Sequence, residues 1–406
     1  MKEIKNIIII NDFDYVQGGA SKIAIQTANL LVTSDMNLKV YFFSAVHNDI
    51  SALDDRIIKI CTNQNEALKE KNKIKGFFNG IYNYKAKKEL KKLLEKLDKE
   101  ETIIHVHGWT KALSSSIFDI AFKMNFKVIL TMHDYFIACP NGGYFNYKKN
   151  YSCNLKPLSI KCIKCNCDSR NYFFKIYRII RQFVQNNIVK LNKKLEDVIS
   201  ISSFSENILK RTLNPKIKIH RIYNPIDINE NIQKINKNTQ KTNIGKNKYF
   251  LYVGRIAKEK GVDVFCAAVS HIKKEGVVVG DGPELEKLKE KYPKISFVGW
   301  KSTDEVKEYM KNSIALVFPS RCYETMGLSA IEANMIGIPV IVSSNTSATE
   351  FADQNIFENG NVNSLESILL KSNLKKKKMS KSLTDSFNSR KYIDTLIKEY
   401  KKILDS

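Results

Sequence analysis

The chain has 406 residues, which is enough for two or three domains. Hydrophobic residues make up 43% of it and charged residues 27%, an ordinary balance for a soluble globular protein that excludes a wholly disordered chain. No apolar run reaches the roughly 18 residues that span a bilayer, and the first residues contain no small-residue cleavage site. We therefore expect a cytoplasmic protein without a signal peptide.

In chain order, apolar runs of strand length alternate with segments of helical period. The strands expected in the first half are Lys5–Ile10, Leu38–Ser44, Thr102–Val106, Lys127–Met132, Val198–Ser202 and Lys218–Tyr223. The helices expected there are Ala20–Val32, Ala86–Leu97, Ala112–Met124 and Phe173–Ile188. The last of these interleaves aromatic residues with arginine, so it is either an amphipathic core helix or a surface for a lipid-linked acceptor or membrane.

A polar stretch, Asp227–Asn247, has no apolar period and is the best candidate for a linker. Alternation then restarts. The strands expected beyond it are Tyr249–Val253, Val277–Val279, Ser296–Val298, Ala315–Phe318 and Pro339–Ser343. The helices are Val262–Ile272, Glu284–Lys291, a helix opened by a capping box at Ser302–Glu305, and Met326–Ile336.

Buried strands that alternate with helices predict parallel sheets covered on both faces. We expect an α/β protein with two Rossmann-like, doubly wound domains that face a central cleft. The predicted N-terminal domain is 1–226, with a cysteine-rich insertion at 139–170. After the linker at 227–247, the C-terminal domain spans 248–388, and a last helix lies within 389–406.

The net charge of +24 favours anionic partners such as nucleic acid, acidic lipid or phosphorylated ligands. The alternative is compositional, because a chain rich in Lys, Asn and Ile carries many solvated lysines. Clusters such as Lys85–Lys92 and Lys375–Lys378 fit a peripheral contact with the inner, anionic face of the cytoplasmic membrane. We expect no specific nucleic-acid partner.

The segment Pro319–Glu332 carries the most chemistry, because it follows a strand and opens a helix. Glu324 and Glu332 are separated by seven residues, and carboxylates are natural acceptors for pairs of sugar hydroxyls. Between them, a helix N-terminus is an anion site. Its free amides are those of Met326, Gly327 and Leu328. This predicts a bound diphosphate. The alternative is that Glu324 is an ordinary surface glutamate and Glu332 an ordinary helix glutamate, since both would produce the same sequence pattern.

Arg255 and Lys260 follow another strand and would reach the same sheet edge as Glu324. Two cations and a helix N-terminus at one cleft suit a diphosphate. His133 stands at the end of a further strand. His105 and His107 lie on one face of theirs, where they would form either an acceptor-side wall of the cleft or core histidines.

Taken together, seven short motifs in this order resemble glycosyltransferase family 4 over nearly the whole chain. They are Gly18-Gly-Ala20, His133-Asp134, Asn224-Pro-Ile-Asp227, Gly254-Arg255…Lys260-Gly261, Gly280-Asp-Gly-Pro283, Phe297-Val-Gly299 and Glu324-x7-Glu332. The resemblance implies the GT-B fold and transfer of sugar from a UDP- or GDP-sugar with retention at the anomeric carbon. It also implies that 1–226 is the acceptor-side domain, that 248–388 binds the nucleotide-sugar, and that the helix within 389–406 crosses back to the first domain. The region 133–171 is similar to a subgroup of polysaccharide and lipopolysaccharide assembly enzymes that carry a cysteine cluster.

By this resemblance, Gly19 contacts the donor diphosphate, His133 lies near the transferred sugar, and Arg255 and Lys260 bind the diphosphate. Glu324 holds the donor sugar and Glu332 the ribose. Attack comes from the front face, with the departing phosphate taking the acceptor's proton. The chain departs from the family at Thr325-Met326-Gly327, and it lacks the usual Asp-Gly-x-Asn-Gly stretch. No Asp-x-Asp pair stands in a suitable loop, so we expect no catalytic metal.

Five of the eight cysteines fall between Cys139 and Cys167. Such density in a cytosolic chain favours a structural zinc site over disulfides, with free thiols as the alternative. These five cysteines are candidates for the four ligand positions of a zinc ion. We predict the ligands Cys153, Cys162, Cys165 and Cys167, and leave out Cys139.

The sequence therefore predicts a retaining glycosyltransferase that extends a lipid-linked bacterial surface glycan. Two alternatives remain. A GT-B nucleotide-sugar epimerase shares the fold, although the Glu-x7-Glu spacing argues against it. A non-catalytic, zinc-bearing module that binds nucleic acid or anionic membrane would explain the charge and the cysteines, but it gives Arg255, Lys260 and the two glutamates no role.

Overall fold

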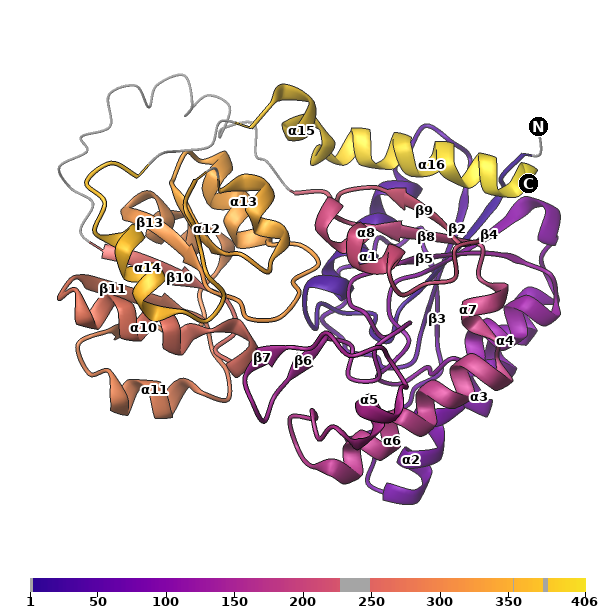
Figure 1. Cartoon of the computed structure of the whole chain (residues 1–406). Coiled ribbons are helices and arrows are strands. Elements are labelled where there is room, and N and C mark those ends of the chain that lie inside the picture. Colours follow the sequence, from indigo (N-terminus) through magenta and orange to yellow (C-terminus); the bar gives the residue numbers. More distant parts are fainter. Residues whose placement is uncertain (1–2, 227–248, 353, 375–378) are drawn as a thin grey trace.

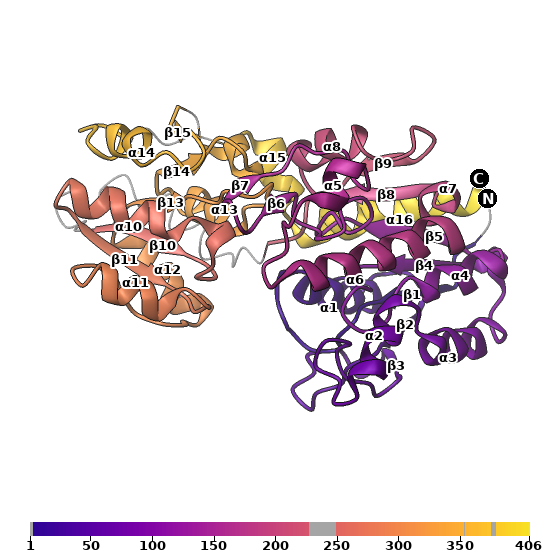
Figure 2. The same ribbon diagram turned by 60° about the horizontal axis from the view of Figure 1, so that its bottom comes forward.

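The computed structural model describes residues 3–226, 249–352, 354–374 and 379–406. The predicted linker at 227–247 and the cluster Lys375–Lys378 lie outside the described residues. Two large parallel sheets stand side by side, each covered by helices on both faces, as Figures 1 and 2 show. This confirms the predicted α/β architecture.

The N-terminal sheet has seven parallel strands in the order β3-β2-β1-β4-β5-β8-β9. They are β1 (Asn6–Ile10), β2 (Lys39–Ser44), β3 (Ile58–Cys61), β4 (Thr102–Val106), β5 (Lys127–Thr131), β8 (Asp197–Ser200) and β9 (Lys218–Arg221). The interior strand β1 has the sequence NIIII and is buried along its whole length, as expected for a parallel strand covered on both faces.

Helices join these strands. They are α1 (Gly19–Val32), α2 (Lys73–Ile81), α3 (Tyr84–Leu94), α4 (Ser116–Lys123), α5 (Ile160–Lys164), α6 (Tyr172–Phe183), α7 (Leu191–Lys194) and α8 (Ser203–Lys210). The helix predicted at 173–188 is not one regular helix. The α-helical part ends at Phe183, and Val184–Ile188 form a wider π-helical turn.

The C-terminal sheet has six parallel strands in the order β12-β11-β10-β13-β14-β15. They are β10 (Tyr249–Val253), β11 (Glu275–Val279), β12 (Ser296–Phe297), β13 (Ser313–Phe318), β14 (Val340–Ser343) and β15 (Ile356–Phe357). Its helices are α10 (Val262–His271), α11 (Leu285–Lys291), α12 (Thr303–Lys311), α13 (Leu328–Met335), α14 (Val362–Leu369) and α15 (Lys381–Ser386). The capping box predicted at Ser302 and Glu305 is present, with both hydrogen bonds formed.

A short antiparallel hairpin lies between the two halves in both views (Figures 1 and 2). It consists of β6 (Phe145–Asn146) and β7 (Tyr151–Ser152). The Ser152 hydroxyl donates to the Arg321 carbonyl, and the Tyr323 hydroxyl donates to the Asn154 side chain. The hairpin thus ties the cysteine-rich region to the loop after β13.

The last helix, α16 (Ser389–Asp405), packs against α1 and β4 of the N-terminal half, as the yellow helix in Figure 1 shows. Its apolar face supplies Tyr392, Leu396 and Tyr400 to the core there. The Tyr392 hydroxyl lies 2.8 Å from Thr27 Oγ1 of α1. Within the part of the chain that the structure describes, no helix is long and apolar enough to cross a membrane.

We expect Leu396→Ala to lower the free energy of unfolding by about 2–5 kcal/mol, because a fully buried leucine leaves a cavity when truncated. Urea unfolding followed by circular dichroism would measure the change. The matched control is Lys398→Ala on the exposed side of the same helix. Equal stability of the two variants would contradict the packing of α16 described above.

Candidate active site

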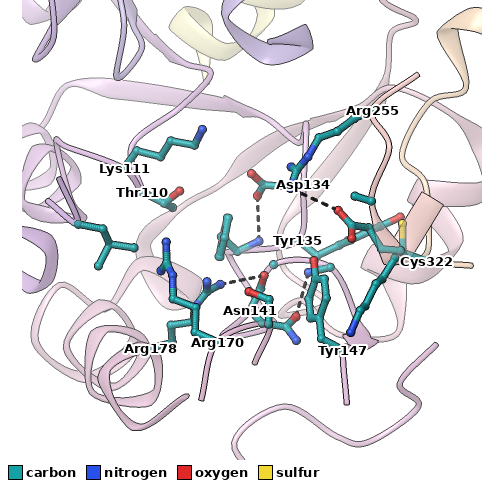
Figure 3. A pocket seen from close by; sticks show the side chains of 18 of the residues that line it. Thr110, Lys111, Asp134, Tyr135, Asn141, Tyr147, Arg170, Arg178, Arg255 and Cys322 are labelled. Carbon is teal, nitrogen blue, oxygen red and sulfur yellow. Dashed lines mark hydrogen bonds and ion pairs between the residues drawn. The ribbon is translucent and has the colours of Figure 1, made fainter. Parts of the chain in front are cut away.

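A cavity of about 810 Å³ lies between the two sheets and takes its lining from both halves of the chain (Figure 3). The four residues predicted as catalytic all line it. They are His133, Arg255, Lys260 and Glu324. His133 is 122 to 191 positions away in sequence from the other three residues, yet all four line one cavity, as the prediction of a central cleft requires.

The parallel sheets explain this convergence. His133 follows β5, Arg255 follows β10, and Glu324 follows β13, so each lies beyond the carboxyl end of its strand. In open α/β sheets, ligands bind outside these ends. Arg255 is extended toward the cavity, and its Nη2 atom lies 3.9 Å from Glu259 Oε1.

Lys260 and Glu324 form an ion pair inside the cavity, and the Ser320 hydroxyl donates to Glu324 Oε1 at 2.8 Å. Burial alone would lower the pKa of Lys260, but the Glu324 carboxylate outweighs burial and holds that pKa above its usual range. The lysine is therefore cationic. Without a ligand, the cation and the acid neutralise each other.

Gly261 sets the position of this pair, because it joins Lys260 to helix α10 with a left-handed φ of 65°. A Cβ atom there would lie 2.1 Å from the Pro319 carbonyl oxygen. Only glycine allows both the backbone angle and the close approach. The two loops that carry Lys260 and Glu324 are thus held against each other by backbone contact.

His133 is fixed from both halves of the chain. Its Nε2 atom lies 2.9 Å from His107 Nδ1, and its carbonyl accepts a hydrogen bond from Thr325 Oγ1 at 3.0 Å. Burial lowers the pKa of His133 to about 4, so the ring is neutral at pH 7. It can position a hydroxyl group, but it carries no charge with which to bind a phosphate.

His105 does not form a wall of the cavity. Its ring is fully buried, with Nδ1 2.6 Å from the Tyr400 hydroxyl and Nε2 2.7 Å from Thr131 Oγ1. His107 is buried as well, and its Nε2 atom has no hydrogen-bond partner among the described residues. Of the two interpretations, the core histidine therefore applies to His105. His107 reaches the cavity only through His133.

Apart from Arg255 and Lys260, the residues predicted to contact the donor nucleotide do not line this cavity. Gly19 is the exposed first residue of α1, and a Cβ there would meet no atom within 4 Å. Gly327 precedes α13 and packs closely, since a Cβ there would lie 2.9 Å from Ala348. Met326 is buried in the apolar core, Leu328 packs against it, and Glu332 lies within α13.

The structure does not assemble the predicted zinc site from Cys153, Cys162, Cys165 and Cys167. Among the described residues, no group of three or more histidine, cysteine, aspartate or glutamate side chains is placed to hold a metal ion. The eight cysteines are free thiols. No step of the chemistry is derived through zinc.

A buried lysine gives the physical reason. Lys175 Nζ lies 3.5 Å from Cys162 Sγ and 3.3 Å from Cys167 Sγ, so an ammonium group already occupies the space beside two predicted ligands. Burial also raises the pKa of Cys153 and of Cys167. That favours the thiol over the thiolate that zinc requires.

Sequence reasoning missed several side chains that line the cavity, above all Asp134. This residue follows His133, and burial raises the pKa of its carboxyl group to about 6. One of its oxygens accepts from the Phe136 amide at 3.0 Å. The sequence feature that could have identified Asp134 is its position directly after His133, at the end of a strand. Cys322, in the loop after β13, lines the cavity too.

Residues 234–384 match the family model described as "Glycosyl transferases group 1". The chain is a glycosyltransferase. A protein of Klebsiella pneumoniae described as an uncharacterized 41.2 kDa protein in the cps region is 26% identical over 269 residues, which cover 62% of this chain and 70% of that protein.

Two solved structures show that the fold of this glycosyltransferase is GT-B. Sucrose-phosphate synthase from Thermosynechococcus elongatus superposes with a TM-score of 0.65 at 17% identity, over 99% of each chain. HepE from Anabaena, in complex with UDP, superposes with a TM-score of 0.57 at 13% identity, over 98% of this chain and 100% of that one.

The buried histidines of the glycosyltransferase should make its stability depend on pH. Burial lowers the pKa of His107 well below the value of about 6.5 in an unfolded chain, so protons prefer the unfolded state. The free energy of unfolding then falls as the pH drops below about 6.5, by about 1.4 kcal/mol per pH unit for such a group.

We expect the stability difference between wild type and His107→Asn to shrink by about 2 kcal/mol between pH 7.5 and pH 5, because the amide cannot take up the proton. Urea unfolding at the two pH values would measure it. Leu396→Ala, which removes no titratable group, should keep the same difference from wild type at both. A His107→Asn difference that is equally constant would refute a buried, neutral His107.

Proposed function

We propose that this glycosyltransferase moves a sugar from a UDP- or GDP-sugar to a growing, lipid-linked bacterial surface glycan such as a capsule or lipopolysaccharide, with retention at the anomeric carbon. The convergence of His133, Arg255, Lys260 and Glu324 on one cavity carries the proposal. Two likenesses support it, namely the relative in a cps region and the neighbour that binds UDP. The proposal also assigns 1–226 to the acceptor-side domain and 248–388 to the domain that binds the nucleotide-sugar.

The chemistry follows from charge. Departure of a nucleoside diphosphate builds negative charge on its terminal phosphate, and Arg255 and Lys260 would stabilise that charge as it develops. Glu324 would release Lys260 to the phosphate and accept hydrogen bonds from donor sugar hydroxyls instead. The neutral His133 ring would orient the sugar. The acceptor hydroxyl would attack from the face that the diphosphate leaves, and the departing phosphate would take its proton. Neither a carboxylate nucleophile on the opposite face nor a separate protein base is then needed.

The same proposal includes a peripheral membrane contact, which a lipid-linked acceptor requires. On α6 and the turn that follows it, large apolar side chains are exposed, with exposed fractions of 68% for Phe173, 56% for Phe183 and 60% for Ile188. Exposed Phe78 and Ile74 lie on α2, which contacts α6. Apolar side chains beside lysines suit the interface of an anionic bilayer.

Binding of the nucleotide can be tested without knowing the acceptor. We expect titration calorimetry to find one nucleotide, UDP or GDP, that binds the wild-type chain. Glu332→Ala should weaken this binding at least tenfold, since a hydrogen bond to a charged group contributes about 1.5–3 kcal/mol. Glu286→Ala, on the exposed side of α11, is the matched control. A folded chain that binds neither nucleotide would refute the proposal.

Glu324→Gln separates sugar recognition from nucleotide binding. We expect this variant to bind the nucleotide about as well as wild type. We expect it to cleave the nucleotide-sugar, and so to liberate the nucleoside diphosphate, at least a hundredfold more slowly, because charged hydrogen bonds to the sugar are lost. Release would be followed with a coupled assay for the free nucleoside diphosphate. Glu366→Gln in α14 is the control. Unchanged release by Glu324→Gln would remove Glu324 from the mechanism.

A further inference from the structure

The two walls of the cavity differ in charge. On the C-terminal wall, three cations face three acids: Arg255, Lys258 and Lys260 against Glu259, Glu284 and Glu324. Lys260 is paired with Glu324, and Arg255 lies 3.9 Å from Glu259. This wall, which holds the predicted donor site, is formally neutral before a diphosphate arrives.

The N-terminal wall has six cations and only two acids, Glu66 and Asp134. Lys69 is paired with Glu66, and Arg178 with Asp168, which lies behind the wall. Four cations remain, and none of them forms an ion pair with a carboxylate among the described residues. They are Lys111, Lys148, Arg170 and Arg181.

Arg181 shows that this positive charge is only partly compensated. Its side chain is buried, and among the described residues its guanidinium donates to two backbone carbonyls, those of Thr110 at 3.2 Å and Pro140 at 3.3 Å. Burial lowers its pKa to about 10, and the Asp134 and Asp12 carboxylates, which form no ion pair with it, only partly oppose that shift. A buried cation without a directly paired carboxylate is costly, and a bound anion would offset that cost.

The other unpaired cations reach the same space from different segments. Lys111 precedes α4, and its ammonium lies 5.4 Å from the centre of the Phe13 ring. Arg170 precedes α6 and stacks on Phe174 at 4.7 Å. Both are exposed at the rim, and Figure 3 shows Lys111 on one side of Asp134 and Arg170 and Arg178 below it.

We propose that the acceptor of this glycosyltransferase carries a phosphate or diphosphate group, which binds to Lys111, Lys148, Arg170 and Arg181 on the N-terminal wall. The inference rests on the proposed function, because it assigns this wall to the acceptor. Four unpaired cations exceed the single charge of a carboxylate and match a diphosphate, whose oxygens accept from guanidinium and ammonium groups alike. Asp134 is then left to hold an acceptor hydroxyl.

The test uses the full chain loaded with a saturating amount of the nucleoside diphosphate that binds it. Inorganic pyrophosphate is then titrated in by calorimetry, so that the donor site is already filled. We expect binding to wild type, and binding at least tenfold weaker to Lys111→Ala/Arg170→Ala. The control Lys216→Ala/Lys218→Ala removes the same charge from exposed positions outside the cavity and should bind like wild type.

No binding of pyrophosphate to the loaded chain, or equal binding by both double variants, would overturn the proposal. If no nucleotide binds at all, the proposed function fails by itself. Pyrophosphate titrated into the chain without nucleotide then tests the anion site on its own. Loss of binding in Lys111→Ala/Arg170→Ala would support the site, and loss of binding only in Arg255→Ala would refute it.

Membrane lipids also carry phosphate, so their head groups are the other class of ligand for these four cations. Flotation with phosphatidylglycerol vesicles, compared with phosphatidylcholine vesicles, distinguishes the two. We expect Lys111→Ala/Arg170→Ala to float with phosphatidylglycerol as wild type does, because the cations line the cavity rather than an outer face. Loss of flotation together with unchanged pyrophosphate binding would assign these cations to lipid head groups and overturn the proposal.

Discussion

Every strand in both large sheets runs parallel to its neighbours, and this constraint decides where chemistry can take place. Parallel strands place all their carboxyl ends at one edge, so the loops after β5, β10 and β13 open toward a common space. The Lys260–Glu324 pair forms there because the loops that carry the two residues touch through Gly261 and Pro319. The donor site proposed for this chain therefore depends on the carboxyl edges of the two sheets facing the same cavity.

Several contacts between the halves fall on one short segment after β13, and others join Glu350 to Ser203 and Tyr223. Thr325 donates to the His133 carbonyl and accepts at its own carbonyl from Ser202 at 2.6 Å, and Tyr323 reaches Asn154 near the hairpin. The segment that carries Glu324 is thus held by the N-terminal half as well as by its own sheet. A substitution that removes the Thr325 hydroxyl would break the hydrogen bond to the His133 carbonyl and consequently disturb the positions of both Glu324 and His133.

Much of this could be predicted from sequence, for physical reasons. Continuous apolar runs such as Ile7–Ile10 favour buried strands, and residues that follow parallel strands gather at one edge of the sheet. His133, Arg255, Lys260 and Glu324 accordingly line one cavity. The zinc prediction is not supported, and cysteine spacing could not show that Lys175, from a helix after the cluster, lies beside two of the predicted ligands. The cationic wall was missed for a similar reason, since its members come from segments whose proximity only tertiary structure creates.

Helix α16 lies last in the sequence but belongs to the first core. Its Tyr400 hydroxyl contacts His105, and its apolar face covers strands completed hundreds of residues earlier. During synthesis, the N-terminal core must therefore stay incomplete until nearly the whole chain has left the ribosome, while the C-terminal sheet can form before that. A chaperone that shields the exposed face of α1 and β4 in the interval would act on the half of the protein that is translated first and finished last.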